Sequence, residues 1–464
     1  MPAKRRIHFE ISERKILLHL FDAVFILSFL YLLSLIFEFH YFEWSTVKFL
    51  KSLLLVSYIY IFGTIFEMYN LQTASNQLQV LRSVILSSIT ASTFYLFTPV
   101  LSPELPKQRI VILVFYFAVL SALLAWRFFY VYFLASTRFS QNVVLICDES
   151  QVEELVLGLE NVDPHYKIIG FVNSDSESVA DVDFHYVKEI KKKDLKRFAG
   201  SNNVSEIIIA SQKTDGITAD LYQQLLHLLE SGYIIREYTQ VYESKTQRIP
   251  VHYIGRDFYR FFPFSRSNNN KLYLIQIRLM EFFLSAFGLT ICLLFIPIIY
   301  IGNLIANRGS LFYTQDRVGK NGVIFKIYKF RTMIENSEVN GAVFASSNDK
   351  RITPFGKFLR KSRIDELPQF FNVLKGDMAV IGPRPERPFF VDEIAALMPF
   401  YETRHVIKPG LTGWAQVNYS YGESIDESLI KLQYDLYYIK HRSVFLDLSI
   451  TFKTITTVLF YRGQ

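Results

Sequence analysis

Two adjacent carboxylates, Asp365 and Glu366, end a strongly basic stretch in the C-terminal third of the chain. Paired acids among lysines and arginines suit a divalent metal ion and a phosphate-bearing substrate, because a carboxylate can bind metal or act as a nucleophile. The same pair could simply cap a helix over residues 365–374, which contributes about 1 kcal/mol. Taken alone, the pair favours the cap.

Basic side chains that could hold an anion lie on both sides of these acids. Lys329 and Arg331 fall in a predicted hairpin, where strand alternation places them on one face. Arg384 and Arg387 lie among prolines in the segment 382–388, whose restricted backbone limits the entropy lost on binding. Arginine's planar fork also suits phosphate oxygens. For either segment alone, solvated cations on a strand or turn remain the alternative.

A short amphipathic helix is predicted directly before the acids. Thr353 is a suitable N-cap, and Pro354 is a suitable first helical residue. Apolar and basic residues form opposite faces over 355–361, so we expect this helix to lie in the plane of the lipid headgroups. Asp365 and Glu366 would then lie at the level of a lipid phosphate.

An apolar segment over residues 282–305 precedes these elements and contains Pro297. Basic residues flank it on both sides, and because cytoplasmic loops carry most Lys and Arg, both ends should face the cytoplasm. We therefore expect a re-entrant helix at about 279–306 that enters the bilayer, breaks at Pro297 and returns. A proline-kinked spanning helix remains the alternative.

The composition of the whole chain indicates a membrane protein. Of its 464 residues 50% are hydrophobic, and the mean hydropathy is +0.20. The 28 Tyr and 43 Phe suit membrane interfaces, and the formal charge of +7 favours anionic lipid or phosphate as a partner. No nucleic-acid recognition motif accompanies this charge, and the two cysteines provide neither a disulfide framework nor a metal site.

The N-terminal part of the chain predicts a four-helix transmembrane domain over residues 1–138. Its apolar runs lie at 16–37, 53–66, 84–100 and 110–126. The first run is long enough to be a permanent anchor rather than a cleaved signal. Basic residues place both ends of the domain in the cytoplasm, although Lys107 and Arg109 oppose this topology. Such a bundle suits an anchor, a sensor, a transporter or a homodimer contact.

Residues 139–265 predict a small parallel α/β domain, a Rossmann-like fold in degenerate form. Its β-branched runs lie at 143–146, 168–172 and 207–210, and its helical patterns at 152–159 and 221–229. A nucleotide-binding version needs glycine after the first strand, but the turn reads Cys147-Asp-Glu-Ser150, whose acids would repel phosphate. A structural or regulatory module is therefore favoured over a dinucleotide site.

The C-terminal segments together resemble the bacterial sugar transferases, or polyprenyl-phosphate glycosyl-1-phosphate transferases, in their long form with an N-terminal membrane bundle. The matching motifs are Phe312-Tyr-Thr-Gln-Asp-Arg-Val-Gly319, Tyr328-Lys-Phe-Arg-Thr-Met333, Arg363-Ile-Asp-Glu-Leu-Pro-Gln-Phe370, Gly382-Pro-Arg-Pro385, Pro409-Gly-Leu-Thr-Gly-Trp414, and Tyr434-Asp-Leu-Tyr-Tyr438 with Ser443 to Asp447. The resemblance implies an α+β phosphoglycosyl transferase domain over 266–464 with a re-entrant membrane helix. Family members often begin that helix with Lys-Arg and a later Asp, where this chain has Arg278 and Glu281.

The resemblance also implies a two-step reaction at the paired acids. Asp365 would attack the β-phosphate of a UDP-sugar, release UMP and carry the phosphosugar, which undecaprenyl phosphate would then accept. Glu366 would help hold Mg²⁺, which neutralises the diphosphate. Phosphate oxygens would be bound by Arg384, Arg331, Lys329, Arg387 and Arg363, with Arg317 and Asp447 as support for the site.

The place in the cell follows from the same resemblance. An undecaprenyl-phosphate glycosyl-1-phosphate transferase would be a multi-pass protein of the bacterial inner membrane with its catalytic domain in the cytoplasm. It would begin exopolysaccharide, capsule or O-antigen synthesis, with the UDP-sugar left open. Two alternatives remain: a membrane glycosyltransferase that moves the sugar without its phosphate and releases UDP, and a scaffold that binds nucleotide-sugars.

Overall fold

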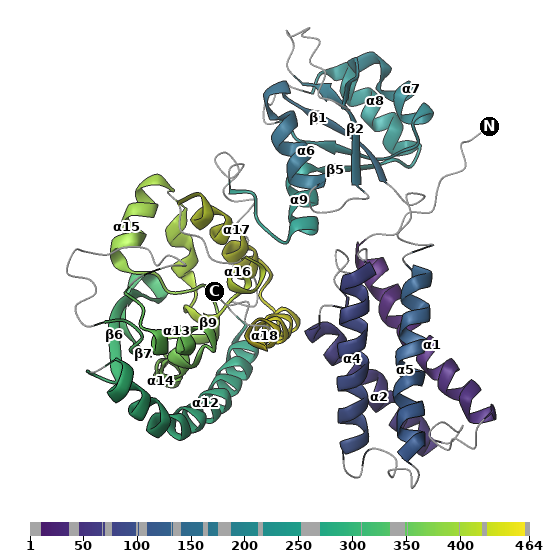
Figure 1. The fold of residues 1–464 in the computed structure, drawn as a ribbon. Coiled ribbons are helices and arrows are strands. Elements are labelled where there is room, and N and C mark those ends of the chain that lie inside the picture. Colours follow the sequence, from purple (N-terminus) through teal and green to yellow (C-terminus); the bar gives the residue numbers. More distant parts are fainter. Residues whose placement is uncertain are drawn as a thin grey trace. The chain divides into compact units, whose positions relative to one another are not determined.

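The chain divides into two compact units between Thr246 and Gln247 (Figure 1). The computed structural model describes residues 11–36, 46–66, 68–69, 77–98, 101, 109–130, 132, 141–160, 166–174, 187–211, 217–251, 270–307, 309–334, 349, 351–398, 400–419 and 425–459. The predicted domain boundaries at 138/139 and 265/266 lie outside these residues. Residues 247–251 already belong to the C-terminal unit, where the Ile249 amide donates to the Gln433 carbonyl at 3.1 Å.

The N-terminal unit contains the predicted apolar helices. They are α1 (Ile11–Ile36), α2 (Thr46–Ile65), α4 (Gln77–Phe97) and α5 (Arg109–Phe129). Three of them hold spans long and apolar enough to cross a membrane, whereas the apolar part of α2, Phe49–Ile65, is shorter. One hydrophobic core joins these helices, and it contains a buried ion pair in which Arg127 Nη2 lies 2.6 Å from Asp22 Oδ2.

The same unit contains the predicted parallel α/β fold. Its strands are β1 (Gln141–Cys147), β2 (Tyr166–Asn173), β3 (Lys188–Glu189), β4 (Val204–Ile209) and β5 (Ile234–Glu237). All pairs are parallel, and the strand order is β3-β2-β1-β4-β5. The helices are α6 (Val152–Glu160), α7 (Leu195–Ser201), α8 (Ala219–Glu230) and α9 (Tyr238–Thr246). This order is the doubly wound one, so the prediction of a small parallel sheet is confirmed.

The turn after β1 is occupied by an acid rather than a glycine. Asp148 is buried there, and its carboxylate accepts a hydrogen bond from the Ser174 hydroxyl at the end of β2. Lys192 Nζ in turn donates to the Ser174 carbonyl at 3.3 Å. In a dinucleotide-binding fold a phosphate group approaches the backbone of this turn closely, but here side-chain contacts occupy the position.

The C-terminal unit mixes helices with short strands. Its elements are α12 (Lys271–Ala306), β6 (Phe312–Val318), β7 (Ile324–Phe330), α13 (Pro354–Lys361), the 3₁₀ helix η7 (Ile364–Gln369), α14 (Phe370–Lys375), β8 (Ala379–Ile381), α15 (Pro388–Leu397), the 3₁₀ helix η8 (Tyr401–Val406), β9 (Gly410–Thr412), α16 (Trp414–Asn418), α17 (Ile425–His441) and α18 (Val444–Leu459). Strands β6 and β7 form an antiparallel hairpin, and β8 pairs with β9 in parallel.

Helix α12 is continuous across Pro297, so the predicted break there is wrong. A proline removes one backbone donor and crowds the preceding turn, which bends a helix without necessarily ending it. Figure 1 shows the ribbon of α12 curving along its length. With 36 residues and high hydropathy, α12 is also long and apolar enough to cross a membrane.

One face of α12 contacts the rest of the C-terminal unit along its whole length. Near its start the Tyr273 hydroxyl donates to Asp447 on α18 at 2.8 Å, and Arg278 caps α14 through the Val373 carbonyl at 2.8 Å. Further along, Gly288 and Gly302 lie so close to aromatic rings of α14 and α13 that a methyl group would overlap them. Most large side chains on the other face are exposed and apolar, including Phe283, Phe287 and Leu294.

Two local predictions on the chain that leads to the acids are confirmed. The hairpin turn contains Asn321 and Gly322 with positive φ, of 56° and 78°. Helix α13 begins as predicted, since the Thr353 hydroxyl accepts from the Gly356 amide at 2.9 Å and Pro354 follows the cap. The segment 365–374 differs: Pro368 lies in a 3₁₀ turn that precedes α14, and neither acid caps a helix.

Candidate active site

Asp365 is the buried member of the carboxylate pair. The chain reaches it through Arg363, whose φ of 57° is uncommon for a residue with a side chain and stores local strain. Asp365 is 6% exposed, and its Oδ1 atom has no hydrogen-bond partner within the described residues. Burial, and after it the neighbouring charge of Glu366, raises the pKa of Asp365 to about 6. Asp365 is therefore the more basic carboxylate of the pair.

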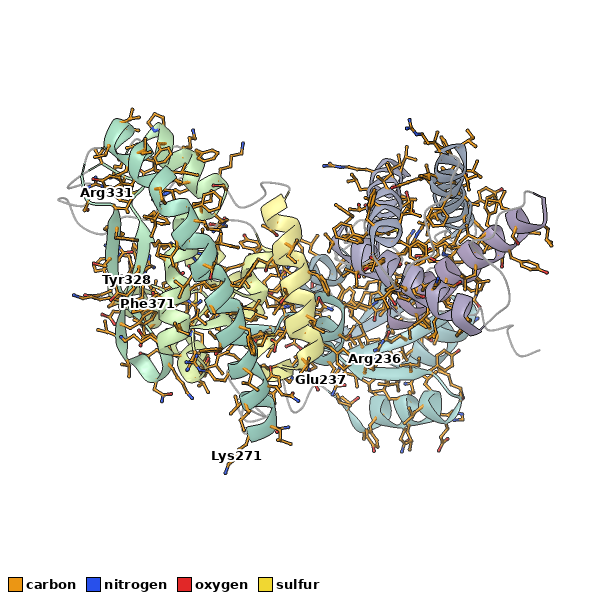
Figure 2. All side chains as sticks on the ribbon, turned by 90° about the horizontal axis from the view of Figure 1, so that it is seen from below. Arg236, Glu237, Lys271, Tyr328, Arg331 and Phe371 are labelled. Atoms are coloured by element: carbon orange, nitrogen blue, oxygen red, sulfur yellow. The ribbon has the colours of Figure 1, made fainter. Side chains whose placement is uncertain are left out.

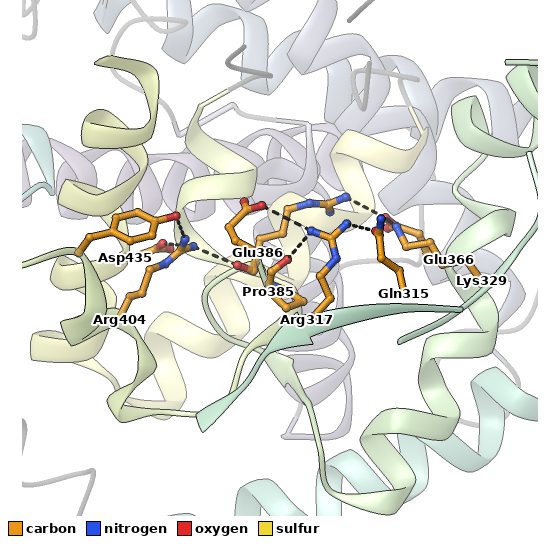
Figure 3. Close-up of polar contacts among 10 residues, drawn as sticks. Gln315, Arg317, Lys329, Glu366, Pro385, Glu386, Arg404 and Asp435 are labelled. Atoms are coloured by element: carbon orange, nitrogen blue, oxygen red, sulfur yellow. Dashed lines mark hydrogen bonds and ion pairs between the residues drawn. The ribbon is translucent and has the colours of Figure 1, made fainter. Parts of the chain in front are cut away.

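Glu366 is surrounded by cations. Its Oε1 lies 3.1 Å from Lys329 Nζ and 3.2 Å from Arg384 Nη2 (Figure 3). Its Oε2 lies 3.4 Å from Arg363 Nη1. Burial opposes the ionisation of Glu366, but the three cations outweigh it and hold the pKa of this carboxyl well below its usual range. Three positive groups thus converge on one negative group, which leaves an excess of positive charge beside Asp365.

Lys329 and Arg331 have different surroundings although the sequence predicts one face for both. Strand β7 ends at Phe330, so strand alternation does not extend to Arg331. The Arg331 guanidinium lies against the end of α12, where it approaches the Asn307 carbonyl and the Ser310 hydroxyl at 3.5 Å each. Figure 2 shows Arg331 near the end of α12 opposite Lys271. Of this predicted pair, the structure brings Lys329 to Glu366.

The two arginines of the proline-rich loop also differ. Arg384 reaches Glu366, with Nη2 3.2 Å from Oε1, and its predicted phosphate-binding role stays a prediction. The Arg387 guanidinium lies over the ring of Phe390, 5.7 Å from its centroid, at the start of α15. Arg384 is therefore the loop residue that contributes to the charge cluster around the paired acids.

The two residues predicted as support hold structure together. Arg317 donates to the Pro385 carbonyl at 3.1 Å and to Gln315 at 2.7 Å, and it lies 3.5 Å from Glu386 (Figure 3). Asp447 accepts from the hydroxyls of Tyr273 and Tyr438 at 2.8 and 2.7 Å. Arg317 thus fixes the loop that carries Arg384, whereas Asp447 fastens α12 to α17 and α18.

A small cleft lies next to Lys329 and Arg384, the two cations that contact Glu366 Oε1. Its lining includes Lys329, Arg384, Arg317, Gln369 and Leu411. Residues three apart eclipse in a 3₁₀ helix, so Gln369 follows Glu366 on the same side of η7. Gln369 is 4% exposed, and its Nε2 has no partner within the described residues. The cations and the unused amide donor that line this cleft are groups that bind anionic oxygen atoms.

Sequence reasoning missed Gln369, Arg404 and Asp435. Gln369 lies in the Arg363–Phe370 motif, but its position on the same side as Glu366 follows only when η7 is a 3₁₀ helix. Arg404 and Asp435 are 31 positions apart, yet their side chains meet at 2.7 Å. Asp435 also belongs to a quoted motif, which was the available signal for it, whereas Arg404 lies outside every motif.

Comparison with known proteins places this site in a family. The model of the family described as "Bacterial sugar transferase" matches residues 272–461. A UDP-N-acetylgalactosamine-undecaprenyl-phosphate N-acetylgalactosaminephosphotransferase of Aeromonas hydrophila is 55% identical over 151 residues, which are 32% of this chain and 36% of that protein. A UDP-glucose:undecaprenyl-phosphate glucose-1-phosphate transferase of Klebsiella pneumoniae is 42% identical over 151 residues, 32% of each chain.

These matches span about a third of the length of those two relatives. A third relative is matched over most of its length. The uncharacterized sugar transferase EpsL of Bacillus subtilis (strain 168) is 39% identical over 153 residues, which are 33% of this chain and 72% of that protein. With its buried acid pair and convergent cations at the matching motifs, the chain belongs to the bacterial sugar transferase family.

Proposed function

We propose that this protein transfers a sugar-1-phosphate from a UDP-sugar to undecaprenyl phosphate, through a phosphosugar carried on Asp365. The observation that carries the proposal is the pairing of a buried, basic carboxylate with a carboxylate neutralised by three cations. The names of the Aeromonas and Klebsiella relatives supply undecaprenyl phosphate as acceptor and a UDP-sugar as donor. Such a reaction would begin the assembly of an exopolysaccharide, capsule or O-antigen.

The first step forms one bond and breaks one. An ionised oxygen of Asp365 attacks the phosphorus that bears the sugar, and the bond from that phosphorus to the oxygen of UMP breaks, so UMP leaves with the electron pair. Lys329 and Arg384 contact Glu366, the neighbour of Asp365 in the chain, and both line the cleft. They would hold the donor's phosphate oxygens and offset the repulsion between two anions. Gln369 would add a neutral donor to the same cleft.

The second step frees the aspartate. A phosphate oxygen of undecaprenyl phosphate attacks the same phosphorus, and the bond to Asp365 breaks and returns the electron pair to the carboxylate. The acceptor is a lipid, so the site should lie at the membrane. Helix α12 supports this arrangement, because its inner face contacts α14, α13 and α18 from Tyr273 to Gly302 while most of its outer face is exposed and apolar.

We further propose that α12 is re-entrant and that α13 lies in the headgroup plane. A helix that crossed the bilayer would carry the elements packed along its whole length into the hydrocarbon, and these include the charged residues beside Asp365. Single cysteines at Lys271 and Ser310 test the path, since both native cysteines are buried. Both positions should react with an impermeant reagent from the cytoplasmic face. Reaction from opposite faces would show that α12 crosses.

Mg²⁺ fits the donor set of the acid pair. Within the described residues no group of three or more His, Cys, Asp or Glu side chains gathers, so an ion here would use the two carboxylates and the substrate's own oxygens. That ligand set is the type Mg²⁺ takes, and Asp365 Oδ1 is an acceptor without a partner. Asp365 would hold the ion through Oδ1, and Glu366 would join it by exchanging its contact with Lys329, Arg384 or Arg363. The ion would neutralise the diphosphate. Chelation with EDTA should abolish turnover, and added Mg²⁺ should restore it.

The identity of the released nucleotide tests the proposed reaction. Purified full-length protein with undecaprenyl phosphate and individual UDP-sugars should release UMP with one of the sugars. Release of UDP instead would identify a glycosyltransferase that leaves the phosphate behind. Binding of a UDP-sugar without turnover would favour the scaffold.

A further inference from the structure

The loop that carries Arg384 is held by its backbone at four consecutive residues. The carbonyls of residues 383 to 386 each accept a hydrogen bond from a different donor. The donors are the Gly410 amide at 2.8 Å, Arg404 Nη2 at 3.0 Å, Arg317 Nη1 at 3.1 Å and the Val318 amide at 2.9 Å, in that order. Pro383 and Pro385 restrict the same backbone further. Most of the freedom left to Arg384 is in its side chain.

Arg404 is the donor that comes from behind the loop. Arg317 lines the cleft and could itself touch a ligand, whereas Arg404 is not among the lining residues. Its side chain is 5% exposed and lies between the loop and α17. Figure 3 shows its guanidinium directed at Asp435 on one side and at the loop backbone on the other.

The orientation of Arg404 is fixed by two further partners. Nη2 donates to Asp435 Oδ2 at 2.7 Å, and Nη1 donates to the Tyr401 hydroxyl. Asp435 is 2% exposed, so the charges of this pair are screened little by water. A guanidinium bound in a plane at several points is well suited to place one N–H on a single carbonyl.

We propose that Arg404, oriented by Asp435 and Tyr401, is a positioning residue that fixes the Arg384 carbonyl so that the Arg384 guanidinium meets Glu366 and the donor's phosphate. This inference rests on the proposed transferase function, in which Arg384 holds the diphosphate. Small displacements of a charged group at a reacting centre lower rates steeply, by about 100-fold for 1 Å. Arg404 therefore acts on the reaction through Arg384 without touching the substrate.

The test is a double-mutant cycle between Arg404 and Arg384. Lysine at 404 keeps the charge beside Asp435, but its single ammonium cannot serve the carboxylate, the hydroxyl and the carbonyl in one plane. In the full-length protein, Arg404→Lys should lower kcat/KM for UMP release by about 10- to 100-fold. In an Arg384→Ala background the same change should lower it by less than about 3-fold, because the group that Arg404 positions is gone.

Arg442→Lys is the matched control. Arg442 is also buried, lies 5.4 Å and 6.0 Å from the ring centroids of Tyr273 and Tyr438, and interacts with Asp447. No hydrogen bond from Arg442 to the carbonyls of residues 383–386 occurs in the described chain. Its effect should therefore be the same factor with and without Arg384, as for a purely structural arginine.

Three results separate the inference from its premise. Equal factors for Arg404→Lys in both backgrounds, or full activity of Arg404→Lys, would overturn the positioning role. A wild-type protein that releases no UMP from any UDP-sugar would overturn the proposed function instead. If Arg404→Lys fails to fold, Asp435→Asn serves in its place, since it leaves Arg404 present but removes one anchor. Its smaller loss should likewise shrink in the Arg384→Ala background, and an unchanged loss would overturn the role.

Discussion

Two buried aspartate–arginine pairs of nearly equal length have different surroundings. In the bundle, Asp22 and Arg127 approach to 2.6 Å with side chains 0% and 1% exposed. In the C-terminal unit, Asp435 and Arg404 approach to 2.7 Å with side chains 2% and 5% exposed. In the described part of the chain Nε has no hydrogen-bond partner in either arginine. Nη1 of Arg127 also has none, whereas Arg404 donates to a hydroxyl through Nη1 and to a loop carbonyl through Nη2.

The first pair joins two helices, whereas the second also holds the loop that carries Arg384. The Asp22–Arg127 pair joins α1 to α5, and a buried pair of this kind can often be exchanged for apolar residues of similar volume. The Asp435–Arg404 pair continues through the Arg384 backbone to Glu366. Similar burial and similar distance therefore do not show which pair affects the proposed reaction. We expect the difference to lie in the further hydrogen bonds that Arg404 donates to the Tyr401 hydroxyl and the Arg384 carbonyl.

The largest expected effect is the loss of UMP release when Asp365, the neighbour of Glu366, is replaced. Asp365→Asn keeps the size of the side chain but removes the nucleophile, so we expect UMP release to fall by about 10⁴-fold or more. Asp377→Asn is the control, because Asp377 pairs with the exposed Lys375 in the same unit. Normal UMP release by the Asp365 variant would show that the nucleophile lies elsewhere.

The bundle pair should respond to single and double changes in opposite ways. Asp22→Asn leaves Arg127 buried without its charge partner and should lower the free energy of unfolding by about 3–5 kcal/mol. The double change Asp22→Leu with Arg127→Met should recover most of that loss, measured by thermal unfolding in detergent. The corresponding double change at Asp435 and Arg404 should not recover UMP release. A double bundle variant as unstable as the single one would contradict the cross-link interpretation.

Two cations near the acids should separate binding from folding. Lys329→Met removes a charge-assisted contact to the substrate's phosphate, worth about 1.5–3 kcal/mol, so KM for the UDP-sugar should rise by roughly 10- to 100-fold. Arg331→Met removes a contact at the end of α12 and should lower the unfolding temperature while KM changes by less than about 3-fold. The reverse pattern would return Arg331 to the phosphate site.

The smallest expected effect is a loss of stability when the space beside the Arg331 guanidinium is filled. A methyl group on Gly309 would overlap the Arg331 guanidinium, so Gly309→Ala should lower the free energy of unfolding by about 1–3 kcal/mol. Gly200→Ala in α7 is the control, because nothing lies within 4 Å of its added methyl group. That change should be neutral or slightly stabilising. Equal effects at the two glycines would mean that Arg331 moves aside freely.

Local signals predicted the elements that carry the site. The Thr353 cap, the hairpin turn at Asn321 and the strands of the parallel sheet depend on neighbours in sequence, and the structure has all of them. Where residue types and local geometry decide the outcome, the sequence was sufficient.

Contacts between distant segments were beyond this reasoning. Arg331 follows the last residue of β7, so its direction depends on the end of α12 rather than on strand alternation. Arg404 reaches Asp435 and the Arg384 carbonyl only because η8, α17 and the loop pack together. The acids at 365 and 366 read as a helix cap because nothing local shows that Arg363 turns left-handed before a 3₁₀ helix.

The position of α12 in the sequence determines what a shortened chain would keep. Helix α12, its contacts described above on α13, α14 and α18, and the acid pair lie after Thr246. The match to EpsL covers 72% of that protein and 33% of this chain, so EpsL is a much shorter relative. We therefore expect a chain that lacks its first 246 residues to keep the exposed apolar face of α12 together with the acid pair, and to need detergent for its extraction.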